Sequence, residues 1–164
     1  MNEIIVADAG PLIALGRTNN IFILNKLFKS IIIPDSVASE CLADKTRPGA
    51  LAIQKSIENT DIKVHFNNSS ILKNNTLGEI LDKGEAAAIE LAYSSKVPLL
   101  IDEKLGRQVA QKLQIKIIGT AGILILAKQN NIIPAVEPIL HNLKEGGYFF
   151  SKNLMDAVLK RVGE

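Results

Sequence analysis

The sequence predicts an α/β fold: a three-layer α/β/α sandwich around a parallel, roughly five-stranded sheet. Short aliphatic runs alternate with helical patterns along the whole chain. Hydrophobic residues make up 47% of the chain and aromatic residues only 4%, so the core must be built from Ile, Leu, Val and Ala. This bias is typical of parallel strands that helices cover on both faces. The length of 164 residues suits one domain, 1–164, whose last part (about 135–164) packs on the rest or forms an interface.

Five segments have the continuous apolar or β-branched character of strands. The first, second and fourth show no polar alternation, which predicts strands buried on both faces. Lys63 and Lys116 interrupt the third and fifth, which we expect at the edges of the sheet. The expected strands span 4–7, 31–33, 62–65, 98–101 and 115–118.

Helical patterns fill the intervals between these strands. Pro11 is expected to open a helix directly after the first strand. The Ala-rich segment 84–95 is strongly helical, and 121–130 is apolar nearly all round, which predicts a buried helix. The stretch 66–76, rich in Asn and Ser, is expected to be the least structured. The other expected helices span 21–28, 36–43, 48–59, 103–113, 135–144 and 152–162.

Charge, cysteine content and hydropathy limit the function classes. A net charge of +2 and a pI near 8.6 do not by themselves indicate a nucleic-acid binder. Cys41 is the only cysteine, which rules out an intrachain disulfide and favours a small buried thiol. The first 15 residues lack the basic segment of a signal peptide, and the longest apolar run is too short to span a bilayer. We therefore expect a soluble cytoplasmic protein.

Four acids stand where an α/β fold would bring them together. Asp8 and Asp102 directly follow the first and fourth predicted strands. In parallel sheets, ligands bind beyond the carboxyl ends of the strands, where the strand order reverses. If these two strands are neighbours, the two acids face each other there. Each can instead cap the helix that follows it, because Asp is a preferred N-cap residue.

Glu85 and Glu40 complete this set. Glu85 shares one helical face with Ala88 and Ile89, and an ionised carboxylate on an apolar stripe needs a cation or hydrogen-bond donors. The alternative is that the negative charge of Glu85, in the first turn, stabilises the helix by its interaction with the helix dipole. Glu40 lies at the edge of an apolar helical face, and a plain solvated glutamate there is nearly as well supported as a member of the acidic set. The remaining acids near these positions are interpreted as caps or surface charges: Asp35, Asp82, Glu90 and Glu103.

A cluster of carboxylate oxygens suits a hard divalent cation such as Mg²⁺ or Mn²⁺. That chemistry points toward metal-assisted cleavage of a phosphodiester. The two histidines, His65 and His141, lie in different predicted elements and lack partners for a zinc site. A receiver-type phosphoacceptor domain, with Thr120 as its switch, is a weaker alternative because the usual acidic pair after the first strand is missing.

The ordered set of motifs resembles the PIN-domain (PilT N-terminus) family, in the group that contains VapC-type toxins. It is closest to a largely uncharacterised prokaryotic PIN-like subfamily. The resemblance covers essentially the whole chain, and no single motif is specific. The matching stretches are 8–13, 84–89, 100–107, 119–124 and 146–151.

The resemblance implies a metal-dependent ribonuclease, which holds one or two Mg²⁺ or Mn²⁺ ions with Asp8, Glu40, Glu85 and Asp102. Ala9-Gly10 and Leu100-Ile101 depart from the family, since many toxins carry Ser or Thr at these places. These missing hydroxyls favour a second hypothesis, a catalytically degenerate PIN scaffold that binds RNA or a protein partner.

The resemblance further implies an RNA substrate, an antitoxin partner if the chain is a toxin, and a homodimer. The homodimer is also suggested by the apolar tail from 121 onward, unless the last helices fold back and bury it. Basic and amide groups near the acids are candidate RNA contacts, although each basic side chain can equally be a solvated charge. These candidates are Lys45, Arg47, Lys104, Arg107 and Thr120.

Overall fold

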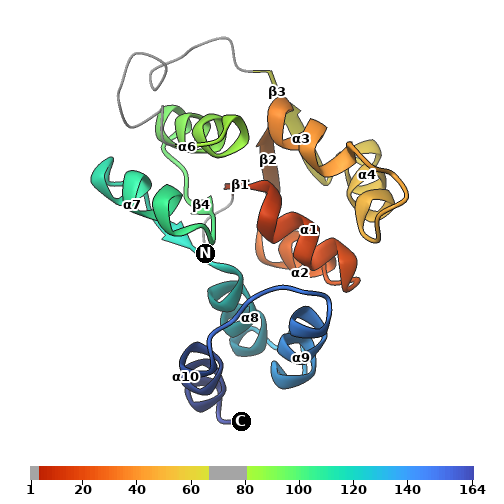
Figure 1. Cartoon of the computed structure of the whole chain (residues 1–164), viewed down its shortest axis with the longest axis vertical. Helices are drawn as coiled ribbons and strands as arrows, with labels where there is room; N and C mark the ends of the chain where they lie inside the picture. The colour runs from red at the N-terminus through yellow and green to blue at the C-terminus, as the bar shows by residue number, and fades with distance from the viewer. Residues whose placement is uncertain (1–3, 67–80) are drawn as a thin grey trace.

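The computed structural model describes residues 4–66 and 81–164, which form a five-stranded parallel sheet with helices around it (Figure 1). The strand order is β3-β2-β1-β4-β5, and every neighbouring pair is parallel. The third and fifth strands are the edges of the sheet, as predicted. The strands are β1 (Ile4–Ala7), β2 (Ser30–Pro34), β3 (Ile62–His65), β4 (Leu99–Leu100) and β5 (Ile117–Ile118).

The helices fall where the sequence predicts them, with small shifts at their ends. α1 begins at Ala9, two residues before Pro11, whose missing N–H costs nothing within the first turn. The stretch 66–76, except Phe66, lies outside the described residues. The described helices are α1 (Ala9–Arg17), α2 (Phe22–Leu27), α3 (Asp35–Leu42), α4 (Ala50–Glu58), α6 (Lys83–Ser95), α7 (Lys104–Lys112), α8 (Thr120–Gln129), α9 (Glu137–Glu145) and α10 (Lys152–Val162).

The order of strands reverses between β1 and β4, which are neighbours, so the condition set for Asp8 and Asp102 to face each other is met. Val6 pairs with Leu99 and Ala7 with Leu100. The backbone amide of Asp8 extends the ladder by donating to the carbonyl of Leu100 at 3.0 Å. The first residues after both strands therefore emerge side by side at the carboxyl edge of the sheet, where α/β proteins bind their ligands.

Helices cover the sheet in a three-layer α/β/α arrangement (Figure 1). α6 packs against β1, β2 and β4, and α2 packs against β2 and α8. The core between the layers is aliphatic, and Ile5, Ile31 and Leu99 are fully buried within it. Cys41 is a buried free thiol, as predicted, and burial raises its pKa to about 12.

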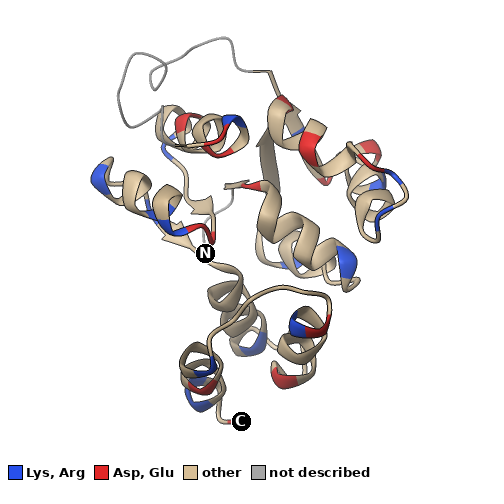
Figure 2. Cartoon of the chain, viewed as in Figure 1, with Lys and Arg blue, Asp and Glu red and all other residues tan. Residues whose placement is uncertain are grey.

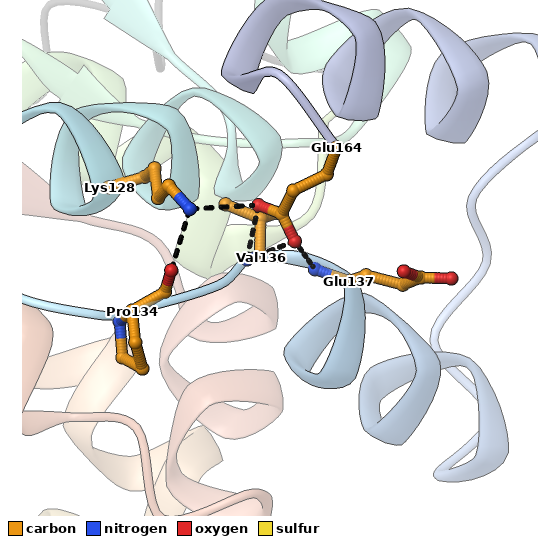
Figure 3. A network of polar contacts seen from close by, with 5 residues as sticks. All are labelled: Lys128, Pro134, Val136, Glu137 and Glu164. Carbon is orange, nitrogen blue, oxygen red and sulfur yellow. Dashed lines mark hydrogen bonds and ion pairs between the residues drawn. The ribbon is translucent and has the colours of Figure 1, made fainter.

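The last helices fold back on the chain and bury much of the apolar tail. Leu124 of α8 and Leu140 of α9 are fully buried, and α10 packs on α8. The side chain of Glu164 accepts hydrogen bonds from the backbone amides of Val136 and Glu137 at the start of α9 (Figure 3). It also pairs with Lys128 of α8 at 3.6 Å. In the described part of the chain, no helix has the length and apolar character needed to cross a membrane.

Candidate active site

An acidic cleft of about 390 Å³ opens at the carboxyl ends of β1 and β4. Its walls carry no basic side chain among the described residues. Figure 2 shows acidic segments on the β1–α1 junction, on α3, and at the starts of α6 and α7, around this part of the molecule. The cleft brings together all four predicted acids and two further ones: Asp8, Glu40, Asp82, Glu85, Asp102 and Glu103.

Asp8 occupies the N-cap position of α1, yet its side chain makes no capping hydrogen bond. The residue is only 6% exposed, so its carboxylate lies largely out of water. Burial raises the pKa of Asp8 to about 6, and the negative charges of Asp82, Glu40 and Asp102 act in the same direction. The nearby Ala9 amide opposes them. Ionised Asp8 is thus costly in this cleft unless a cation offsets its charge.

Asp102 is held by Thr120, the first residue of α8. The backbone amide of Thr120 donates to Oδ1 at 2.8 Å, and its hydroxyl donates to Oδ2 at 2.6 Å. A Cβ atom at Gly119 would lie 2.8 Å from Oδ1, so the turn needs glycine for this close approach. Burial raises the pKa of Asp102, while the bonds from Thr120 and the charge of Arg107 lower it.

This contact corrects the prediction that Thr120 offers a contact to RNA. The residue is fully buried, and both its amide and its hydroxyl are bound to Asp102. Its structural role is to position a carboxylate of the cleft. α8 begins at Thr120, with Gly119 at the N-cap position.

Tyr148 reaches Asp102 from the segment between α9 and α10. Its hydroxyl donates to Oδ2 of Asp102. The segment turns at Gly147, which has a φ of +93° that favours glycine. The guanidinium of Arg17 donates to the carbonyl of Gly146 and ties this turn to α1. Tyr148 therefore enters the cleft from a fixed turn rather than from a free loop.

Glu85 lies in the first turn of α6, and Asp82 is the N-cap residue of that helix. Oδ1 of Asp82 accepts a hydrogen bond from the Glu85 amide at 2.8 Å, so Asp82 is a cap, one of the two roles that the sequence allowed for it. Burial raises the pKa of the half-buried Glu85 to about 7, and the charges of Asp82, Asp8 and Glu103 add to this. Asp82 is therefore both a cap and a source of negative potential in the cleft.

Glu40 reaches the cleft from α3. Its Oε2 lies 3.0 Å from where a Cβ atom at Gly84 would be placed, so the carboxylate rests against the start of α6. Partial burial raises the pKa of Glu40, as does the charge of Asp82. The rest of the side chain is exposed to solvent.

The donor set matches the chemistry of a hard divalent cation, since every charged group on the cleft walls is a carboxylate. The side chains as they stand do not form a finished metal centre. No group of three or more His, Cys, Asp or Glu residues among those described is arranged to hold an ion. Both oxygens of Asp102 are engaged by Thr120 and Tyr148.

None of the predicted basic contacts lines the cleft. Lys45 and Lys104 are exposed, and Arg47 pairs with Asp44 at 3.5 Å. Arg107 is half-buried and donates through Nη1 to the carbonyl of Ile101 at 3.0 Å.

Sequence reasoning missed the four other charged or aromatic residues of the cleft walls. Asp82 stands three residues before Glu85, the spacing of a capping box, which could have pointed to it. Tyr148 follows the Gly146-Gly147 turn, but nothing local to it indicates a partner 46 residues away. The other two are Glu103 and Phe149.

Comparison with known proteins agrees with this architecture. The family model DUF3368, described as a PIN domain, matches residues 4–164. No curated protein matches the chain. The particular likeness to VapC-type toxins stays a prediction. With nearly the whole chain matched, the protein belongs to the PIN-domain family, whose members are usually nucleases and generally use divalent metal ions.

Proposed function

We propose that this chain is a Mg²⁺- or Mn²⁺-dependent ribonuclease. The observation that carries the proposal is the acidic cleft, in which carboxylates from six points of the chain meet at the carboxyl ends of β1 and β4. The raised pKa values of Asp8 and Glu85 support it, because buried like charges favour a divalent cation as their common partner.

Each acid has a proposed role. Asp8 and Asp102 would anchor the principal ion, Glu85 would complete its shell, and Glu40 would orient water or hold a second ion. A bound divalent ion supplies an acidified water and offsets charge on the phosphate. The chain itself fixes Asp102 through Thr120 and holds Asp8 at the end of a buried strand.

One observation favours the second hypothesis, a degenerate scaffold that binds RNA or a protein without cleaving it. Asp102 already has hydrogen-bond partners for both oxygens, from the backbone and hydroxyl groups of Thr120 and from Tyr148. Such a carboxylate is satisfied without a cation. RNA binding without metal-dependent cleavage would identify this case. The receiver-type alternative is set aside, because the family assignment covers nearly the whole chain.

The test is cleavage of single-stranded RNA by the purified chain with Mg²⁺, with Mn²⁺ and with EDTA. Asp8→Asn and Asp102→Asn should each reduce the rate by about a hundredfold or more, because each removes a charge from the proposed ion site. Asp156→Asn, an exposed acid of α10, is the matched control and should cleave like the wild type. Full activity in EDTA, or normal cleavage by both cleft variants, would contradict the proposal.

The biological setting is a further part of the proposal. We propose one domain, 1–164, that acts on RNA in the cytoplasm, with basic contacts at Lys45, Arg47, Lys104 and Arg107. A toxin role is supported if a small neighbouring reading frame encodes an antitoxin-like protein. The family resemblance supports a homodimer. A mass of 17.8 kDa in light scattering, that of the monomer, would rule the homodimer out.

A further inference from the structure

A second cavity, of about 510 Å³, adjoins the acidic cleft. The two cavities share Asp102, Tyr148 and Phe149 as lining residues. Whereas the first is walled by carboxylates, the second is walled mainly by aliphatic side chains. These include Ile117, Ile118, Ile125, Leu154 and Val158.

Phe149 stands at the boundary between the two cavities with 85% of its surface exposed. Its neighbours in the chain are anchored: Phe150 is 6% exposed, and the rings of Tyr148 and Phe150 pack with centroids 5.0 Å apart. The hydroxyl of Tyr148 is bound to Asp102. The backbone on both sides of Phe149 is thus fixed, and the ring is displayed to solvent instead of joining the core.

Arg107 brings a positive charge to the second cavity. It donates to the Ile101 carbonyl through Nη1, and a guanidinium has further N–H groups for a ligand. The combination is apolar walls, an exposed aromatic face and an arginine beside a carboxylate. A nucleobase has matching chemistry, with a flat π face for stacking and acceptors on its edge.

We propose that Phe149, Arg107 and the second cavity form a subsite for one unpaired nucleobase of the RNA, next to the phosphodiester that enters the acidic cleft. This inference rests on the proposed ribonuclease function and adds the place where one base of the RNA is held. Base-paired RNA keeps its bases stacked within the helix, so the subsite selects single-stranded RNA. An apolar side chain of a second copy of this chain is the competing occupant, and the test below separates the two.

The test measures binding of a short fluorescent single-stranded RNA by anisotropy, with Ca²⁺ in place of Mg²⁺ to suppress cleavage. Phe149→Ala should weaken binding by about 5- to 150-fold, which corresponds to about 1–3 kcal/mol for one stacked base. Phe149→Trp should retain it. Phe66→Ala is the matched control, since Phe66 directly follows β3 and is 74% exposed, and it should bind like the wild type.

An RNA that carries a single abasic position is the second arm. When the missing base is the one that stacks, the wild type should bind the abasic RNA as weakly as Phe149→Ala binds the intact RNA. The affinity of Phe149→Ala should be the same for the two RNAs.

Equal RNA affinity of wild type and Phe149→Ala, in a protein that still cleaves RNA with Mg²⁺, overturns the subsite and leaves the ribonuclease proposal standing. If the wild type neither binds nor cleaves RNA, both fail. If Phe149→Ala changes the mass in light scattering but not RNA affinity, the ring is an interface between copies and the subsite is wrong.

Discussion

Replacing Asp8 by Asn should make the metal-free protein more stable at neutral pH. The substitution is nearly isosteric and keeps the residue at the N-cap position of α1, for which Asn is as suitable as Asp. It removes a charge that burial and three neighbouring acids make unfavourable in the folded state. The charge of Asp8, a proposed metal ligand, is therefore expected to destabilise the folded protein when no metal is bound.

The size of this effect follows from the pKa of Asp8. Folding raises it from 3.8 to about 6, and each pKa unit is worth about 1.4 kcal/mol, so ionised Asp8 costs the folded state about 3 kcal/mol. Below about pH 4 the group is protonated in both the folded and the unfolded chain, and the cost is absent. It grows as the pH rises toward 6 and is complete above that value.

The assay is thermal and urea unfolding of wild type and variant in EDTA at pH 3.5 and pH 7. Asp8→Asn should raise the melting temperature at pH 7 by up to about 6–12 °C, given about 2–4 °C per kcal/mol for a chain of this size. The gain should vanish at pH 3.5. Added Mn²⁺ should stabilise the wild type more than the variant. Asp156→Asn should change the free energy of unfolding by less than about 0.5 kcal/mol at either pH. A variant that is no more stable than wild type at pH 7, or that gains equally at pH 3.5, would refute the reasoning.

Two further predictions concern the surroundings of the cleft. Thr120→Val keeps the buried shape but removes the hydroxyl bond to Asp102, and should lower the free energy of unfolding at pH 7 by about 1.5–3 kcal/mol in urea titrations. The loss should be smaller at a pH where that carboxylate is protonated. Reversing Lys45, Arg47 and Lys104 to Glu should weaken RNA binding and flatten its dependence on log salt by about 0.7 for each phosphate that the protein no longer neutralises. An unchanged slope in anisotropy titrations would show that RNA enters elsewhere.

The strands and helices were predictable because their hydrophobic patterns are local. The positions of Asp8 and Asp102 were also predictable, since a parallel sheet with β1 beside β4 has only one place for residues that follow those strands. Asp82 is the helix cap that its spacing before Glu85 indicates. That Asp82 also lines the cleft depends on where α6 packs, and no local sequence pattern specifies that packing.

The partners of Asp102 could not be predicted. Thr120 follows it by 18 residues and Tyr148 by 46, and both contacts depend on how α8 and the α9–α10 turn are placed. The family resemblance drew attention to missing hydroxyls just before Asp102. In the folded chain two hydroxyls do reach this carboxylate, from later elements. A residue type missing at a motif position was therefore a poor guide to the groups around the site.

The bond network of Glu164 in Figure 3 bears on which parts of the molecule open together. One carboxylate joins the end of α10 to the start of α9 and, through Lys128, to α8. Amide protons of these three helices should therefore exchange with solvent as one cooperative unit rather than fray separately. The turn that carries Tyr148 lies inside that unit, and its opening would withdraw the phenol from Asp102. The packing of the C-terminal helices is thereby coupled to the environment of Asp102, a carboxylate of the acidic cleft that follows β4.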